Sequence, residues 1–586
     1  MSTSTEPDPR RHRDQLIDRG RSLVGDTPPA APIVRSSSAP PGFPSAIPVD
    51  TITFTDWSTY IHVPGVQVAR VSNAADVVEV CNWAATAGYT VRPVGQGHNW
   101  SPILLARNTA HGAKIMLVDT TKLTASSIDT SDGNPLATFG TGITLEAASA
   151  YLAGLDNRGA AAAPGFAFPQ LPAPGNLTLG GALAIGAHGT VVPCGAPGEN
   201  VNLMSCLSNL ITAFDAVVTN PDGSTPCTYA IRHFERSETD AAAFLVHLGR
   251  AFLTSVTLQV EPNFYLQLHC LFPDAADLFA APGTPPNDDN PQFATLLDDY
   301  GRVEVLWFPY NVGTFVQCNR RQDYLIKPQV RGPYNFPWMN QVSWLENRLI
   351  AAALKAFPKS TPAFTGGEYY IAKGSEAGVV LNGTARDLEI YLKDSTLRVS
   401  LFGWALQLPR AEVQQVANQF FQQLTTMLSA YKAKSIYPIN AAAEIRCTTV
   451  DRMQAVPWAN AAPPPLGATR SVAPGDTSLD TVIWLNVGTI TGTPGANEFY
   501  TELETWILDT WGSTKPDRLR PEWSKAWAYT ADGPWTNTAV IERIRDTYNQ
   551  AVYAPLDLTW VTTTLAGYDR ANLFTSPLLD VLFSPG

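Results

Sequence analysis

The first half of the chain alternates between stretches with the period of a helix and stretches with the period of a strand. Apolar residues recur at helical spacing from Val77 to Ala84, and Ser72 or Asn73 can cap the helix that they predict. Short apolar runs at 68–71 and 89–92 flank this helix and predict strands. The result is a strand, helix, strand unit whose last strand leads into a glycine-rich loop.

Similar patterns continue to about residue 265. An Ala-rich helix is predicted at 145–155, and strands are predicted at 114–119, 213–219 and 252–260. The sequence Asn-Pro-Asp-Gly that follows residue 219 predicts a hairpin turn. Together these elements indicate a mixed α+β domain.

The second half combines alternating strands with long helices. Strands are predicted at 303–310, 441–446 and 482–487, and the segment 411–433 has the clearest helical period. Residues 274–292 are rich in Ala, Pro, Asp and Gly, which is typical of a surface loop or a domain joint. We expect a second α+β domain, in which helices cover a large antiparallel sheet.

A chain of 586 residues exceeds the size of a single hydrophobic core, so more than one domain is expected. The predicted leader is rich in arginine and then in Pro, Ser and Ala, and it lacks the apolar segment of a secretion signal. The predicted parts are a disordered leader at 1–45, a first domain at 46–265, a second at 266–545, and a C-terminal segment at 546–586 that packs back on the first domain.

Composition and charge narrow the class of partner. The chain is 45% hydrophobic and 16% charged, with a net charge of -12 and no concentrated Lys/Arg face, which argues against a nucleic-acid partner. Fifteen tryptophans could help to line an apolar cavity. The seven cysteines form no CxxC pair, so no metal site is predicted. The sequence does not decide whether two of them form one disulfide. No apolar run is long enough to span a membrane.

The stretch from Val91 to Pro102 is the first candidate for a ligand-binding loop. Gly95 and Gly97 allow backbone N–H groups to approach an anion closely. The neutral imidazole of His98 could act as a nucleophile, a base or a ligand near pH 7, although a histidine that only satisfies loop carbonyls is the commoner case. A dinucleotide fingerprint is excluded, because Trp-Ser-Pro follows where a third glycine should open a helix.

Two further glycine-rich stretches lie downstream, at 139–144 and 171–190. In the second stretch, prolines stiffen a loop, and Gly180 and Gly181 open a short helix rich in Ala and Leu. The N–H groups at the start of such a helix could bind phosphate.

Four polar residues interrupt the predicted strands of the second half. Glu444 and Arg446 fall on one face of a strand, within reach of each other, and spacing alone favours a plain ion pair. Glu304 would ordinarily be a solvated carboxylate. Asn486 lies in an apolar strand, where a satisfied core amide is the simplest interpretation.

The three glycine-rich loops, in this order, resemble the PCMH-type FAD-binding domain of the vanillyl-alcohol-oxidase flavoproteins. Further motifs look like those of the bacterial cholesterol oxidases with covalently bound FAD. Each motif is weak by itself, but five in one order are specific, and they extend over most of the chain. These motifs are Leu171–Gly175, Gly180–Ala184, Glu444–Cys447, Trp484–Val487 and Arg520–Lys525.

The resemblance implies that the protein binds FAD and that the 8α-methyl group of FAD is bonded to His98. The other residues that it implies around the cofactor come from the same three loops. They are Arg92, Pro93, Gly95, Gln96, Gly97, Asn99, Trp100, Gly140, Gly142, Pro174, Gly175, Leu179, Gly180, Gly181, Ala184, His188 and Gly189.

The resemblance also implies the activity of a flavin-dependent sterol oxidase. Such an enzyme oxidises the 3β-hydroxyl of cholesterol by hydride transfer to FAD, isomerises the product to the 4-en-3-one, and reduces O2 to H2O2. By this resemblance, Glu444 acts as the base, and Arg446 steadies the alkoxide and forms with Glu444 a gate for oxygen. Glu304 moves the proton during isomerisation, and Asn486 is a hydrogen-bond partner of the gate.

The partners implied are therefore a sterol and O2, with at most transient contact with a membrane surface. Related oxidases tend to be exported, but no signal peptide is visible, so no localisation is predicted. Two alternatives to a sterol oxidase remain. One is an FAD oxidase of the same fold that acts on a sugar or another polar alcohol, and the other is a flavin- or lipid-binding protein without turnover.

Overall fold

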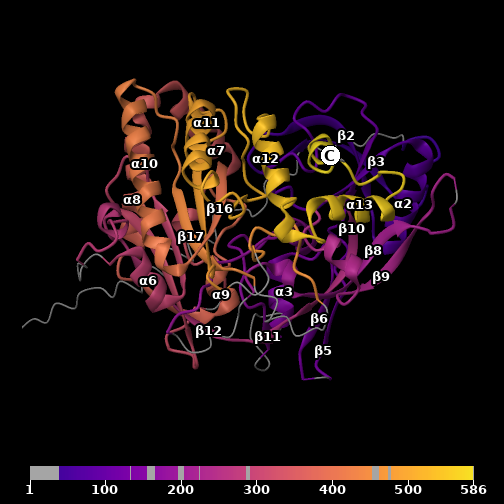
Figure 1. Ribbon diagram of the computed structural model, residues 1–586, viewed down its shortest axis with the longest axis horizontal. Coiled ribbons are helices and arrows are strands. Elements are labelled where there is room, and N and C mark those ends of the chain that lie inside the picture. Colours follow the sequence, from indigo (N-terminus) through magenta and orange to yellow (C-terminus); the bar gives the residue numbers. More distant parts are fainter. Residues whose placement is uncertain are drawn as a thin grey trace, which may run out of the picture.

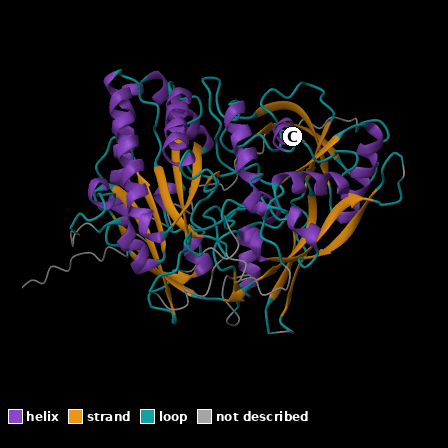
Figure 2. Cartoon of the chain, in the orientation of Figure 1, coloured by secondary structure: helices purple, strands orange, loops and turns teal. Residues whose placement is uncertain are grey.

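The computed structural model describes residues 39–131, 133–154, 165–195, 204–223, 225–285, 291–330, 332–451, 461–472 and 477–584. Residues 1–38, most of the predicted leader, lie outside this set. Two units that both combine helices and strands lie side by side, which confirms the predicted α+β class (Figures 1 and 2).

The first unit begins with a four-stranded sheet in the order β1-β2-β4-β3. Strand β4 pairs in parallel with both β2 and β3, and helix α2 (Ala74–Ala87) connects these two strands. Asn73 accepts a hydrogen bond from the N–H group of Asp76, and Gly88 ends the helix with a φ of 70°. The predicted helix and its flanking strands are thus confirmed. The strands are β1 (Val49–Thr55), β2 (His62–Arg70), β3 (Thr90–Val94) and β4 (Ile115–Asp119).

A second, antiparallel sheet in the order β5-β6-β10-β8-β9 completes this unit. Strands β8 and β9 form the hairpin that was predicted after residue 219. The helix predicted at 145–155 is observed as α3 (Leu145–Leu152). The remaining elements are β5 (Ser126–Asp129), β6 (Leu136–Gly140), β7 (Phe166–Ala167), α4 (Leu179–Ala184), β8 (Ile211–Thr219), β9 (Tyr229–Glu235), β10 (Phe252–Gln259) and β11 (Glu261–Pro262).

The second unit is built on an eight-stranded sheet in the order β15-β12-β14-β13-β17-β18-β16-β19. Every pairing in it is antiparallel, which confirms the predicted sheet. The central strands β17 and β18 are buried along their whole length. The strands are β12 (Tyr265–Leu271), β13 (Arg302–Trp307), β14 (Thr314–Gln322), β15 (Val380–Thr384), β16 (Ser400–Leu408), β17 (Ala443–Thr449), β18 (Thr481–Thr489) and β19 (Leu519–Pro521).

The two faces of this sheet have different neighbours. On β13, Val303, Val305 and Trp307 join a core that includes α10, whose Phe421 ring centre lies 5.0 Å from that of Trp307. Helices α10 and α11 cover this face in Figure 1. Glu304 and the even-numbered positions of β13 face the opposite side, which α8 and α9 cover only in part. The helices are α5 (Ala275–Leu278), α6 (Phe293–Tyr300), α7 (Trp344–Ala356), α8 (Thr361–Glu376), α9 (Ala385–Glu389), α10 (Val413–Ala433) and α11 (Ala496–Ile507). The short helix α5 lies in the stretch 274–292, where a loop was predicted.

The C-terminal helices contact the first unit. Leu573 and Phe574 belong to the core beneath α2, and Arg250 Nη1 lies 3.2 Å from a carboxylate oxygen of Asp569. Among the described residues, no helix is long and apolar enough to cross a membrane. These last helices are α12 (Thr538–Tyr548), α13 (Leu558–Tyr568) and α14 (Pro577–Leu582).

Candidate active site

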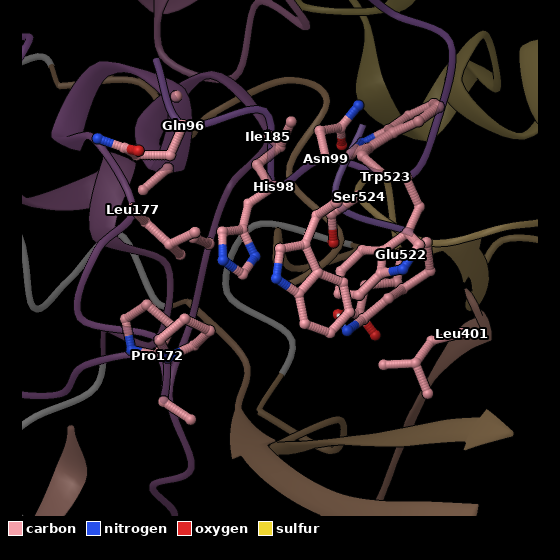
Figure 3. Close-up of a pocket in the computed structure, with 18 of the residues that line it drawn as sticks. Gln96, His98, Asn99, Pro172, Leu177, Ile185, Leu401, Glu522, Trp523 and Ser524 are labelled. Atoms are coloured by element: carbon pink, nitrogen blue, oxygen red, sulfur yellow. Dashed lines mark ion pairs between the residues drawn. The ribbon is translucent and has the colours of Figure 1, made fainter. Parts of the chain in front are cut away.

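A cavity of about 400 Å³ lies between the glycine-rich loops of the first unit and the partly open face of the large sheet. In Figure 3, His98 and Leu177 lie on one side of it and Leu401 and Glu522 on the other. Most of the residues that the sequence singled out line this cavity. They are Arg92, Pro93, Gly95, Gln96, Gly97, His98, Asn99, Trp100, Pro174, Gly180, Gly181, Ala184, His188, Glu304, Glu444 and Arg446.

Six of the expected site residues do not line the cavity, and they are Gly140, Gly142, Gly175, Leu179, Gly189 and Asn486. At three of these positions, close packing explains why the residue is glycine. A β-carbon at position 140 or 142 would collide with a backbone carbonyl of the preceding loop, and one at position 189 would lie 2.7 Å from the carbonyl oxygen of Leu171. These glycines allow the chain to pack closely behind the cavity. Leu179 is fully buried in the core.

The loop that carries His98 is fixed by contacts with neighbouring segments of the first unit. A β-carbon at Gly95 would collide with the side chain of Thr178, so the first and the last glycine-rich loops approach closely here. Gly97 has a φ of 66°, a conformation that favours glycine. Arg92 is buried and donates a hydrogen bond of 2.6 Å to the carbonyl oxygen of Gly249. Arg92 therefore anchors the end of β3 below the loop.

The His98 ring is held by two residues that the sequence did not indicate. Its ring centre lies 5.1 Å from that of Trp57, with the planes 20° apart, and its Nε2 lies 3.5 Å from Oδ1 of Asp394. Burial lowers the pKa of His98, although Asp394 acts in the opposite direction. The imidazole is therefore neutral near pH 7 and keeps a lone pair that can act as a nucleophile.

The polar residues of the large sheet meet through its register. Glu304 of β13 is paired with Arg446 of β17, and Glu444 of β17 is paired with Asn486 of β18. Because alternate side chains share a face, Glu304, Glu444 and Arg446 all point to the cavity. Arg446 Nη1 lies 2.6 Å from Oε1 of Glu444 and 3.9 Å from Oε1 of Glu304. The predicted pairing of Glu444 and Arg446 on one face is confirmed, whereas Glu304 is buried and not solvated.

The two glutamates of this cluster have opposite pKa shifts. Burial, with the charge of Glu444, raises the pKa of Glu304 to about 8. For Glu444, burial also acts to raise the pKa, but the charges of Arg446 and Lys525 outweigh it, and the pKa falls below its ordinary value. Near neutral pH the pair therefore holds one proton, on Glu304. The hydroxyl of Tyr391 donates a hydrogen bond to Glu304.

Three further residues from other segments complete the cluster. Glu522 Oε1 lies 3.3 Å from Nη2 of Arg446 and 3.8 Å from Nζ of Lys525, and these cations help to lower the pKa of Glu522 although burial opposes them. His188 stacks on Trp484, with ring centres 3.6 Å apart. Two cations thus face two carboxylates, which leaves the buried cluster without net charge. The sequence stretch 520–525 contains Glu522, but its pattern did not reveal the charge pairing.

Asn486 is the cross-strand partner of Glu444 but does not line the cavity. Neither atom of its side-chain amide has a hydrogen-bond partner among the described residues. A β-carbon on Gly403 would collide with this amide, so the glycine leaves room for it. The simple interpretation of a satisfied core amide is therefore wrong, and the amide can still accept or donate a hydrogen bond.

Comparison with known proteins decides the family. Residues 270–584, more than half of the chain, match the family described as cholesterol oxidase, substrate-binding. The chain belongs to this family. Residues 66–208 match the FAD binding domain family. This cholesterol oxidase relative is therefore an FAD-dependent oxidoreductase of the vanillyl-alcohol-oxidase type, with separate FAD-binding and substrate-binding units. No curated protein sequence matches the chain.

Solved structures agree with this assignment. A solvent-stable cholesterol oxidase is 34% identical, with a TM-score of 0.84 over 93% of this chain and 100% of the other. The cholesterol oxidase from B. sterolicum is 30% identical, with a TM-score of 0.84 over 94% of this chain and 100% of the other. A chitooligosaccharide oxidase, at 12% identity and a TM-score of 0.52 over 91% of this chain and 97% of the other, shares the fold alone.

The residues of the first unit fit FAD. Residues of the loops at 91–102 and 171–190 line the cavity on that side, and their glycines allow close approach of the backbone to a flat ring system and to phosphates. The neutral His98 lies on the same wall. The acidic and basic cluster lines the same cavity.

Proposed function

We propose that this protein is a flavin-dependent sterol oxidase. It oxidises the 3β-hydroxyl of cholesterol or a related sterol, isomerises the product to the 4-en-3-one, and reduces O2 to H2O2. One observation carries this proposal: a protonated Glu304 lies beside an ionised Glu444 and Arg446 in a cavity that apolar side chains such as Leu306 and Phe308 also line. When bound, FAD accepts the hydride and passes its electrons to O2.

Oxidation of an alcohol needs a base for the hydroxyl proton and a positive charge beside the developing alkoxide. Glu444 is the ionised carboxyl of the pair and accepts the proton. Arg446, at 2.6 Å from Glu444, donates hydrogen bonds to the oxygen as its charge grows. Glu522 and Lys525 carry opposite charges beside this pair, so the cluster has no net charge before Glu444 takes up the substrate proton.

Isomerisation moves the double bond from the 5,6 to the 4,5 position, so one proton leaves C4 and one is added at C6. Once Glu444 has passed the hydroxyl proton on to solvent, the pair of Glu304 and Glu444 again holds one proton and one vacant site, so it can take the proton from C4 and return one at C6 without net change. We assign the delivery of the proton to Glu304, which Tyr391 holds in place.

Covalent attachment of FAD would use His98. Burial beside Trp57 favours the neutral imidazole, which would bond to the 8α carbon once that methyl group has lost a proton. The electron pair of the broken C–H bond would remain in the flavin, which O2 would then reoxidise. Asp394 can accept the proton that the imidazole loses on alkylation, because its oxygen lies 3.5 Å from Nε2.

Arg446 and Glu304 line both the main cavity and a second, smaller one. This smaller cavity is lined by Arg446 and Glu304 together with Gln317 and Asn319. A turn of the Arg446 side chain would open a path between the two cavities, and Asn486 could then bind the displaced carboxylate. We propose this gate as the route by which O2 reaches the reduced flavin.

Contact with a membrane surface would occur through α7 and α8. These two helices and their connection carry six exposed large apolar side chains, of which Phe357 and Tyr370 are 70% and 69% exposed. Arg348, Lys355 and Lys359 lie in the same region of a chain that is acidic overall. An apolar patch with basic neighbours suits the surface of a bilayer that holds a sterol. The six side chains are Trp344, Leu345, Leu349, Phe357, Tyr370 and Ile371.

The deciding experiment supplies cholesterol in detergent to the purified flavoprotein under air and follows H2O2 and the conjugated enone together. Equal amounts of both products are expected. Peroxide without the enone would leave the oxidase and remove the isomerase role. If neither product forms, a same-fold oxidase of a polar alcohol becomes the better proposal. If no alcohol bleaches the flavin under nitrogen, the result would instead indicate a binding protein without turnover.

A further inference from the structure

One carboxyl group in the cavity has no role in the proposed reaction. Glu368 of α8 lines the cavity, and its Oε2 is buried without a hydrogen-bond partner among the described residues. Burial raises its pKa to about 8, so the group is a neutral acid near pH 7. A buried polar group without a partner is costly, and a ligand that supplies the missing hydrogen bond removes that cost.

The position of Glu368 relative to the reacting end follows from the fold. Thr365, one turn earlier in α8, donates a hydrogen bond of 2.7 Å to the carbonyl oxygen of Pro309, and the Tyr369 ring packs against Phe308. Phe308 lies four residues beyond Glu304 along the same chain direction, which corresponds to about 13 Å of extended strand. Glu368 therefore lines the cavity on the side of Phe308, away from Glu304.

Apolar side chains separate this carboxyl from the charged cluster. Leu306, Phe308, Trp338 and Met339 line the cavity near it. A long, apolar molecule whose hydroxyl is oxidised beside Glu444 would extend past these residues and bring its other end to Glu368.

We propose that Glu368 recognises a second hydroxyl group, on ring D or on the side chain of the sterol. The preferred substrate class is then a 3β-hydroxysterol with a polar group at the end remote from the oxidised carbon. This inference rests on the proposed sterol oxidase function. A neutral carboxyl suits the task because it can both donate and accept a hydrogen bond with a hydroxyl.

The test compares matched sterols on the intact flavoprotein. The pairs are cholesterol with 25-hydroxycholesterol, and androst-5-en-3β-ol with androst-5-ene-3β,17β-diol. For at least one pair, kcat/KM of the wild-type protein should be about fivefold to tenfold higher for the hydroxylated member, which is the usual contribution of one buried hydrogen bond. The difference should lie in KM, because Glu368 does not touch the reacting carbon.

Two variants and a control complete the test. Glu368→Leu should remove the preference for the hydroxylated sterol and should improve kcat/KM for the sterol without the second hydroxyl. Glu368→Gln should keep most of the preference for the hydroxylated sterol. Glu79→Leu, at an exposed glutamate on α2, should behave as the wild type. If the ratio of kcat/KM between the two sterols of each pair is the same in the wild type and in Glu368→Leu, the inference is overturned, while the proposed oxidase function stands. Absence of turnover with every sterol, in every variant, would instead count against the proposed function.

Discussion

Arg446 sets the charge of the proposed base, so its replacement by methionine should change how flavin reduction depends on pH. In the wild type, the guanidinium group 2.6 Å from Glu444 is the main cause that holds the pKa of this buried carboxyl below its ordinary value. Methionine fills a similar volume without the charge. Burial then dominates, and the pKa of Glu444 should rise.

The cavity itself indicates the size of this effect. Glu368 lines the same cavity without a counter-charge, and burial raises its pKa to about 8. If Glu444 in the variant approaches that range, its ionised fraction falls about tenfold at pH 7 and about hundredfold at pH 6. A base works only in its ionised form, so activity is present above the new pKa and is lost as the pH falls. Lys525 still favours the ionised form, which makes these factors upper bounds.

The assay is stopped-flow reduction of the flavin by cholesterol under nitrogen, between pH 5.5 and 9.5. The wild-type rate should be nearly constant from pH 6 to 8, and the rate of Arg446→Met should rise with pH. Arg446→Lys keeps the charge and should remain close to the wild-type profile. Arg410→Met, which removes an arginine from a surface pair with Asp298, is the matched control. A loss of rate in Arg446→Met that is the same at every pH would refute the reasoning.

Four further predictions follow from the same structure. Glu304→Gln should oxidise cholesterol within about tenfold of the wild-type rate but release the 5-en-3-one, which the absence of enone absorbance would reveal; normal enone formation would contradict the shuttle. His98→Ala should lose its flavin on acid precipitation, whereas the wild type should retain yellow colour in the pellet, and a colourless wild-type pellet would exclude the covalent bond. Glu368, with its raised pKa, stabilises the fold below the unfolded pKa near 4.5, and this stability is lost as the pH rises to about 8. The fall in melting temperature between pH 5 and pH 9 should therefore be smaller in Glu368→Gln, and an unchanged fall would contradict the shift. Leu349→Ser combined with Phe357→Ser should reduce sedimentation with anionic cholesterol vesicles at least about fivefold while turnover in detergent is unchanged, and equal sedimentation would exclude this patch as the contact.

Local features of the fold could be predicted because neighbours in sequence decide them. Asn73 caps α2 through a hydrogen bond to a residue three positions away, and the turn after residue 219 closes the β8–β9 hairpin. Strand alternation alone placed Glu444 and Arg446 on one face. In the same way, the glycines at 95 and 97 indicated a loop that approaches a ligand or another chain segment.

The sequence by itself therefore determined a set of helices, strands, loops and candidate functional groups. The order of its motifs also gave the resemblance to the FAD-dependent cholesterol oxidases. Only the tertiary structure decided how these groups act. The register of β13 on β17 brings Glu304 to Arg446, and the fold brings Glu368 to the same cavity. The charge of each group depends on burial and on partners from distant segments, and the short-range patterns of a sequence contain neither. For this reason Glu304, expected to be solvated, is a buried acid that holds its proton.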